Sequence, residues 1–166
     1  RVLRGGSFDR TANEVRATEG TILERIPPRL TVRRGAALEL SHVLMLIDDP
    51  MMSVVEPLYD RRDTLTRLYD FPLMMSGGHL TGYAVTDPGD IAAVMGALAT
   101  LKARLTGNLL YAVGDGNHSL ATANAYWEEV KPTLTPAQQA AHPARFAMVE
   151  LENIHDDALI FEPIHR

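Results

Sequence analysis

The sequence predicts an α+β fold. Its 166 residues are 46% hydrophobic and 22% charged, which is ordinary for one globular domain. Several short apolar runs bounded by turn residues are typical of strands, and other segments carry apolar residues at helical spacing. These strands and helices do not alternate strictly, which favours the α+β class over a parallel βαβ array.

The N-terminal residues are expected to lie outside the folded domain. Residues 1–15 are charged and contain two glycines, which favours an arm or linker before a domain of residues 16–166. The first residue is Arg1, and no signal-like stretch follows it. We therefore expect an internal piece of a longer, cytoplasmic protein.

The first half of the domain contains two predicted strands. Residues 16–30 end at a Pro27-Pro28 pair, which is expected to stop any helix. The apolar run of residues 42–50 predicts a buried strand, and residues 79–85 predict another strand after a glycine turn. Two leucines of the ambiguous segment between these strands suggest a short helix: Leu65 and Leu68.

The clearest helical pattern follows. A helix is predicted to start at Asp87 and Pro88, an N-cap residue followed by proline in the first turn. Its apolar stripe comprises Ile91, Val94, Met95, Leu98, Leu101 and Leu105. Residues 109–113 predict a strand that leads directly into a second helix.

The last third of the chain predicts one more helix and two more strands. Thr135 and Pro136 with Gln138 resemble a capping box, which starts a helix. Apolar runs at residues 145–151 and 158–164 predict strands on either side of a polar turn.

Composition excludes several classes of protein. The chain has 16 basic and 21 acidic residues, and the resulting formal net charge of −5 argues against a nucleic-acid partner in the absence of a basic stripe. No apolar run approaches ~20 residues, so we expect no membrane span. The absence of cysteine excludes disulfides and thiolate chemistry, and the six histidines lack the helical i, i+4 spacing of a zinc site.

The strongest candidate site is the sequence GDGNHS, from Gly114 to Ser119. Its glycines allow a tight turn and close approach of a ligand, and the helix that follows offers free N–H groups and a positive dipole end to a phosphate. Asp115 could orient a metal or a hydroxyl, and His118 could donate to an anion. The alternative is a plain strand-to-helix turn in which Asn117 and Ser119 act as caps.

Two further clusters are weaker candidates. Glu152 and Asn153, in a polar stretch, could place a carboxylate and an amide near a nucleotide or Mg²⁺, which prefers oxygen ligands. Their alternative interpretation is a solvated turn. Glu19, in a charged segment, could act as a general base, or it could belong to an ordinary surface loop.

Several separate blocks together resemble one bacterial and archaeal family, domain of unknown function 1015. The blocks are RATEGTILERIPPRL, LMLIDDP, GGHLTGY, YAVGDGNHSLATA, HPARFAMVELENIHD and FEPIHR. That family is similar to the ParB-like superfamily, which includes ParB partition proteins and free-serine kinases. The resemblance implies a ParB-like mixed sheet with packed helices and a strand-turn-helix phosphate loop.

The resemblance also assigns residues. In many relatives the loop reads Asp-Gly-His-His-Arg, which matches Asp115 to Ser119, with Asn117 in place of the first His and Ser119 in place of the Arg. The sequence from Glu152 to His155 resembles the Glu-Asn-x-Gln-Arg box of ParB proteins, which helps to bind nucleotide and metal. Glu19 with Thr21 resembles a His-Glu-x-Thr element.

The resulting prediction is an ATP- and Mg²⁺-dependent kinase that phosphorylates free L-serine or a similar small hydroxyl compound. Asp115, Glu19 and His118 are the predicted catalytic residues, and Asp115 and Glu152 the predicted metal ligands. The predicted nucleotide-binding residues are Gly114, Gly116, Asn117, His118, Ser119 and Asn153. The alternative from another class is a non-catalytic nucleotide-binding module, a switch of ParB type.

Overall fold

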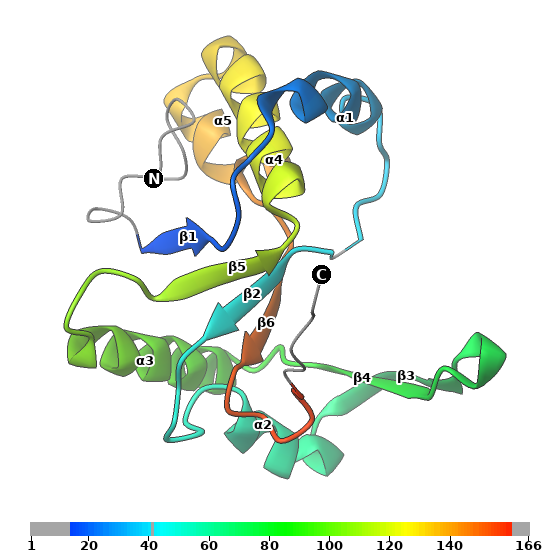
Figure 1. Ribbon diagram of the computed structural model, residues 1–166, viewed down its shortest axis with the longest axis vertical. Helices are drawn as coiled ribbons and strands as arrows, with labels where there is room; N and C mark the ends of the chain where they lie inside the picture. Colours follow the sequence, from blue (N-terminus) through cyan, green and yellow to red (C-terminus); the bar gives the residue numbers. More distant parts are fainter. Residues whose placement is uncertain (1–13, 41, 161–166) are drawn as a thin grey trace, which may run out of the picture. The chain divides into compact units, whose positions relative to one another are not determined.

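The computed structural model describes residues 14–40 and 42–160 (Figure 1). The chain folds into two compact units. The first unit combines residues up to Asp48 with Leu105–Asp156, and the second comprises Asp49–Arg104 and the residues after Asp156. Nearly all of the arm predicted for residues 1–15 falls outside the described residues.

The first unit is built on a four-stranded mixed sheet with the strand order β1-β5-β2-β6. β1 runs parallel to β5, β2 runs antiparallel to β5, and β6 runs parallel to β2. The strands are β1 Val15–Ala17, β2 Leu44–Ile47, β5 Tyr111–Asp115 and β6 Glu150–Asn153. A mixed sheet with several helices confirms the α+β class.

Three helices accompany this sheet, and Figure 1 shows them grouped at one side of it. They are α1 Ile26–Arg33, α4 Asn117–Val130 and α5 Pro136–Ala141. Short 3-10 turns flank them at Leu23–Arg25, Lys131–Thr133 and Pro143–Arg145. α1 packs against α4. The buried apolar residues of the unit are Leu30, Val43, Ile47, Leu110, Val113, Ala123 and Ala144.

Three predictions concerned helices of the first unit: a helix directly after the strand at residues 109–113, a helix started by Thr135, and a helix stop at Pro27 and Pro28. The first two are confirmed. α4 follows β5 directly, and α5 begins with the full capping box of Thr135 and Gln138. The expectation for Pro27 and Pro28 is wrong, because they lie in the first turn of α1 and start a helix. Proline lacks only an N–H there, and the N–H groups of a first turn have no intrahelical partner in any case.

The strands differ from the predictions at their ends. The runs at residues 42–50 and 109–113 contain β2 and most of β5, as expected. Residues 145–151 contribute only Glu150 and Leu151 to a strand, because pairing with β2 begins at Glu150. Ala158–Ile160 are not in a strand, and the rest of the run predicted at 158–164 lies outside the described residues.

The second unit contains a two-stranded antiparallel hairpin, a long helix and shorter turns. Its elements are α2 Glu56–Asp60, β3 Thr66–Pro72, β4 His79–Ala84 and α3 Pro88–Arg104, with 3-10 turns at Arg62–Thr64 and Met74–Ser76. β4 and α3 confirm two predictions, and Asp87 Oδ1 accepts from the Gly89 N–H at 2.8 Å as an N-cap should. The short helix suggested by Leu65 and Leu68 is wrong, since Leu68 lies on β3.

Within the described ranges, no helix is both long and apolar enough to cross a lipid bilayer.

Candidate functional site

The topology of the first unit brings three chain segments to one edge of its sheet. The parallel pairing of β1 with β5 carries the segment after Ala17 past the carboxyl end of β5. The antiparallel pairing of β2 with β5 places Leu44 beside Asp115, so the residues before β2 lie at the same edge. The predicted GDGNHS loop begins there, between β5 and α4.

The two glycines of this loop are required by packing against β2. Gly116 has φ +87°, and a Cβ there would lie 2.8 Å from the His42 carbonyl oxygen and from the α-carbon of Val43. A Cβ on Gly114 would lie 3.2–3.3 Å from the side chains of Leu46 and Leu44. The glycines therefore permit close approach of protein, rather than leaving an open space for a phosphate.

The first turn of α4 is tied to the segment after β1. The Ile22 N–H donates to His118 Nε2 at 3.0 Å, and the Asn117 amide donates to the Gly20 carbonyl at 3.4 Å and to Thr21 Oγ1 at 3.3 Å. Both Asn117 and His118 are buried. Because Nε2 accepts, a neutral His118 carries its proton on Nδ1, and Nε2 cannot donate to an anion.

The two predicted carboxylates at this edge are exposed. Asp115 Oδ1 accepts from the Gly116 N–H at 2.6 Å. Glu19 lies in the same segment as Thr18, whose N–H and hydroxyl both donate to the Val113 carbonyl. These two bonds hold the backbone next to Glu19 beside the carboxyl end of β5, the strand that ends at Asp115.

His42, which was not among the predicted site residues, contacts the last residue of the GDGNHS loop. His42 Nε2 lies 2.6 Å from Ser119 Oγ, and His42 Nδ1 lies 2.8 Å from the Leu40 carbonyl oxygen. A carbonyl only accepts, so Nδ1 carries the hydrogen and Nε2 of the neutral ring accepts from the Ser119 hydroxyl. His42 directly precedes the apolar run of β2, but only the long-range pairing of β2 with β5 reveals its partner.

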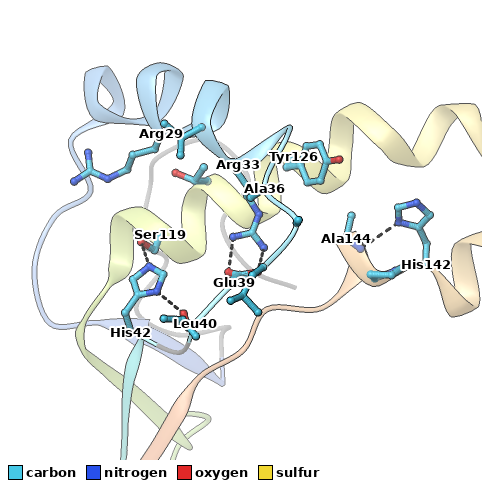
Figure 2. A pocket seen from close by; sticks show the side chains of 15 residues that line it. Arg29, Arg33, Ala36, Glu39, Leu40, His42, Ser119, Tyr126, His142 and Ala144 are labelled. Atoms are coloured by element: carbon cyan, nitrogen blue, oxygen red, sulfur yellow. Dashed lines mark hydrogen bonds and ion pairs between the residues drawn. The ribbon is translucent and has the colours of Figure 1, made fainter.

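Ser119 and His42 line a cavity of about 550 Å³ between α1, α4 and the loop that follows α1 (Figure 2). This volume falls within the usual range for small-molecule sites, about 300–1,000 Å³. The other polar or charged lining residues are Arg29, Arg33, Glu39, Thr122, Tyr126 and His142. Asp115, Asn117, His118 and Glu19 are not among the residues that line it.

The two lining arginines differ in their partners. Arg33 forms a bidentate ion pair with Glu39, with Nη–Oε distances of 2.5 and 2.7 Å, which Figure 2 shows across the loop. Arg29 Nη1 donates to the Arg25 carbonyl at 3.2 Å, and no carboxylate of the described chain pairs with Arg29. Arg29 therefore has no carboxylate partner in the described chain, and Figure 2 shows its guanidinium extending along the outer side of α1, away from Ser119 and His42.

One further ion pair braces α1 against α4. Arg34 contacts Glu129 through two hydrogen bonds of 2.9 and 2.6 Å. The hydrogen bond from Arg34 lowers the pKa of the Glu129 carboxyl, and the same bond raises the pKa of Arg34. This brace links the C-terminal end of α1 to α4, the two helices that frame the cavity.

The predicted cluster of Glu152 and Asn153 lies away from the GDGNHS loop, on the opposite side of β2. Asn153 pairs with Ile47, whereas Asp115 pairs with Leu44 on the other side of β2. Three residues along a strand correspond to about 10 Å, so the structure does not bring this cluster to the GDGNHS loop. Asn153 is buried, and its Oδ1 accepts from the His155 N–H at 3.3 Å.

A multidentate metal site is not formed by the described side chains. Among them, no group of three or more His, Asp or Glu residues is arranged to hold an ion. Glu152 pairs with Leu46 and is therefore separated from Asp115 by β2. Of the two predicted metal ligands, only Asp115 lies beside the start of α4.

The sheet and the cavity define an α+β unit with a small-molecule-sized site. The sequence matches the family described as protein of unknown function (DUF1015) over residues 7–166, and the chain belongs to that family. Comparisons with curated proteins and with solved structures found no match.

Proposed function

We propose that the first unit binds a nucleotide, with its phosphates at the start of α4, in the cavity beside α1. We further propose that the bound nucleotide is ATP and that its γ-phosphoryl group passes to a small hydroxyl compound such as free L-serine. The observation that carries the proposal is the position of Ser119, which is the third residue of α4 and also lines the cavity.

The charges around the cavity favour an anionic ligand. The N-cap residue of α4 is Gly116, which offers no side-chain cap to the N–H groups of the first turn, although the Asp115 carboxylate accepts from the Gly116 N–H itself. Arg29 adds a guanidinium without a carboxylate partner in the described chain. An arginine can bind a phosphate through two parallel hydrogen bonds, so it suits this ligand better than a point charge would.

The burial of Asn117 and His118 restricts where the phosphates can lie. Since the backbone of His42 and Val43 fills the space beside Gly116, a ligand has access to α4 on the side of Ser119. The phosphates are therefore proposed to contact Ser119 and His42, with the rest of the nucleotide along the apolar lining of α1. Arg29 would join them after its exposed side chain turns from the direction drawn in Figure 2 toward Ser119.

Of the two predicted Mg²⁺ ligands, Asp115 is better placed than Glu152 to hold an ion beside phosphates at the start of α4. Mg²⁺ keeps several waters and often takes only one or two carboxylates together with substrate phosphates. Asp115 is exposed, lies two residues before α4, and has one oxygen engaged by the Gly116 N–H. When bound, the ion would neutralise phosphate charge, and Asp115 would hold it at the edge of the loop.

A non-catalytic nucleotide-binding module is the second candidate, and one observation favours it. Glu39 is the carboxylate that lines the cavity, and both of its oxygens are occupied by Arg33. A carboxylate engaged in this way is a poor general base for the acceptor hydroxyl. On this alternative the nucleotide would change the protein's conformation or partner without turnover.

The experiment is calorimetric titration with ATP and Mg²⁺, followed by an assay for phosphoserine with free L-serine. Arg29→Gln is expected to weaken ATP binding about tenfold to a hundredfold, since a hydrogen bond to a charged group contributes about 1.5–3 kcal/mol. Arg62→Gln is the matched control, because Arg62 also donates Nη1 to a backbone carbonyl, that of Tyr59, but belongs to the second unit.

Each outcome separates the candidates. Binding that Arg29→Gln weakens and Arg62→Gln does not, together with phosphoserine formation, supports the kinase. The same binding without product supports the module. A lack of nucleotide binding by the intact protein contradicts both.

A further inference from the structure

We propose that Ser119 is a nucleophile activated by His42 and that it accepts the phosphoryl group covalently before the group reaches the final acceptor. The identity of the phosphoryl donor rests on the proposed function. The activation of Ser119 rests on the arrangement of Ser119, His42 and Leu40 alone.

The three groups have the geometry of an activated hydroxyl. Ser119 Oγ lies 2.6 Å from His42 Nε2, and the opposite ring nitrogen donates to the Leu40 carbonyl at 2.8 Å. A nucleophilic hydroxyl needs a base within about 2.6–3.2 Å and a third group that orients the base. Here a backbone carbonyl is the third group, and it fixes the tautomer in which Nε2 can take the proton (Figure 2).

The location of the pair suits an electrophile that carries negative charge. Both residues line the cavity, and Ser119 lies in the uncapped first turn of α4. The helix dipole would stabilise charge that develops on a phosphoryl group attacked from Ser119. The other serine with a described side-chain partner, Ser53, donates to the carboxylate of Asp49 and has no histidine base.

The covalent route also removes the need for a free carboxylate in the cavity, where Glu39 is held by Arg33. In the first step, Ser119 Oγ attacks the terminal phosphorus, the Oγ–P bond forms and the bond to the nucleoside diphosphate breaks. The serine proton moves to His42 Nε2 and is then released to solvent.

In the second step, the acceptor hydroxyl attacks the phosphorus of phosphoserine and gives its proton to His42. The Oγ–P bond breaks, and His42 returns the proton to Ser119 Oγ. The net change is phosphoryl transfer from the nucleotide to the acceptor with release of one proton, and the enzyme is regenerated.

The test begins with a fluorophosphonate probe, whose reaction with a serine requires an activated hydroxyl and no nucleotide. The intact protein is treated with the probe, and the modified residue is mapped by peptide mass spectrometry. Ser119 is expected to be modified, whereas Ser53 is not. In His42→Asn, whose amide can still donate to the Leu40 carbonyl but cannot take a proton, labelling should slow by about 10²–10⁴-fold.

Controls keep the result specific. His79→Asn removes an exposed histidine of the second unit and should label at the wild-type rate. Ser119→Ala should abolish labelling, and melting temperatures show that each variant is folded. If Ser119 in the wild-type chain is not labelled, or if His42→Asn labels as fast as wild type, the proposed activation is wrong.

A second arm uses ATP with Mg²⁺ and measures phosphoserine at Ser119 by mass spectrometry. Phosphorylation that is lost in His42→Asn supports the covalent route. Nucleotide binding without phosphoserine overturns that route and leaves direct transfer or simple binding. Probe labelling without any nucleotide binding overturns the proposed nucleotide donor and leaves the activated serine intact.

Discussion

The Ile22 N–H donates a hydrogen bond to Nε2 of His118 at 3.0 Å, across 96 residues of sequence. This bond links the segment after β1 to the first turn of α4, where Asn117 makes two more bonds to the same segment. His118 is therefore engaged in holding the loop together, which differs from the anion donor that the sequence suggested.

His118→Ala is expected to lower the free energy of unfolding by about 1–3 kcal/mol, because the Ile22 N–H loses its acceptor. For a chain of this length the melting temperature should fall by about 2–4 °C per kcal/mol. His118→Gln, which restores an acceptor, should recover part of the loss. Equal melting temperatures for wild type and His118→Ala would contradict the role assigned to the bond.

Gly116→Ala is expected to destabilise the first unit by about 1–3 kcal/mol, since alanine is strained in the left-handed region. The added Cβ would also lie 2.8 Å from the His42 carbonyl oxygen. Thermal unfolding measures the effect. Gly107→Ala is the control, because a Cβ there meets nothing within 4 Å, and it should leave the melting temperature nearly unchanged.

The Arg34–Glu129 brace makes stability depend on pH. The pKa of Glu129 is lowered from 4.5 in the folded chain, so its ion pair contributes fully above that value and is lost as the pH falls through the lower folded pKa. The melting temperature of wild type should therefore exceed that of Glu129→Gln at neutral pH, and the difference should vanish in strong acid.

Glu128→Gln is the matched control for this experiment. Glu128 is the adjacent exposed carboxylate, and its Oε1 lies 3.8 Å from Lys131 Nζ rather than in a bidentate contact with arginine. Its substitution should have the smaller effect at neutral pH. A difference between wild type and Glu129→Gln that stays constant down to strong acid would show that the brace is not ionic.

The hairpin of the second unit allows a direct measurement of a pKa. A hydrogen bond that the Asp70 carboxylate accepts from His79 Nε2 is the main cause that lowers the pKa of Asp70 below 3.8. An NMR titration of the Asp70 carboxyl carbon should give a midpoint below that value. In His79→Ala the midpoint should rise toward it, and an unchanged midpoint would contradict the assigned cause.

Local signals in the sequence were sufficient for much of the fold. The capping box of Thr135 and Gln138 and the Asp87 cap act within a few residues, so their helices start where they were expected. β1 was not predicted because it is only three residues long and depends on pairing with β5. Pro27 and Pro28 were misassigned because proline ends one helix and starts another, and only α1 itself shows which applies.

The candidate site was predictable only in part. The GDGNHS sequence identified the turn into α4, since glycine next to a helix start is a local signal. It did not show that His42 reaches Ser119, 77 residues away, or that the backbone before β2 fills the space beside Gly116. Those contacts arise from the order of strands in the sheet, which no pattern of neighbouring residues encodes.

The central claim is that an anionic ligand binds at the first turn of α4 from the side of the cavity. Amide NMR titration of the ¹⁵N-labelled protein with ATP and Mg²⁺ tests it most directly, because each backbone N–H of Asn117, His118 and Ser119 reports separately. We predict saturable shifts of the Ser119 amide, together with shifts of His42 and of the residues around Arg29. Saturable shifts confined to other parts of the chain, or none at all at millimolar nucleotide, would contradict the account.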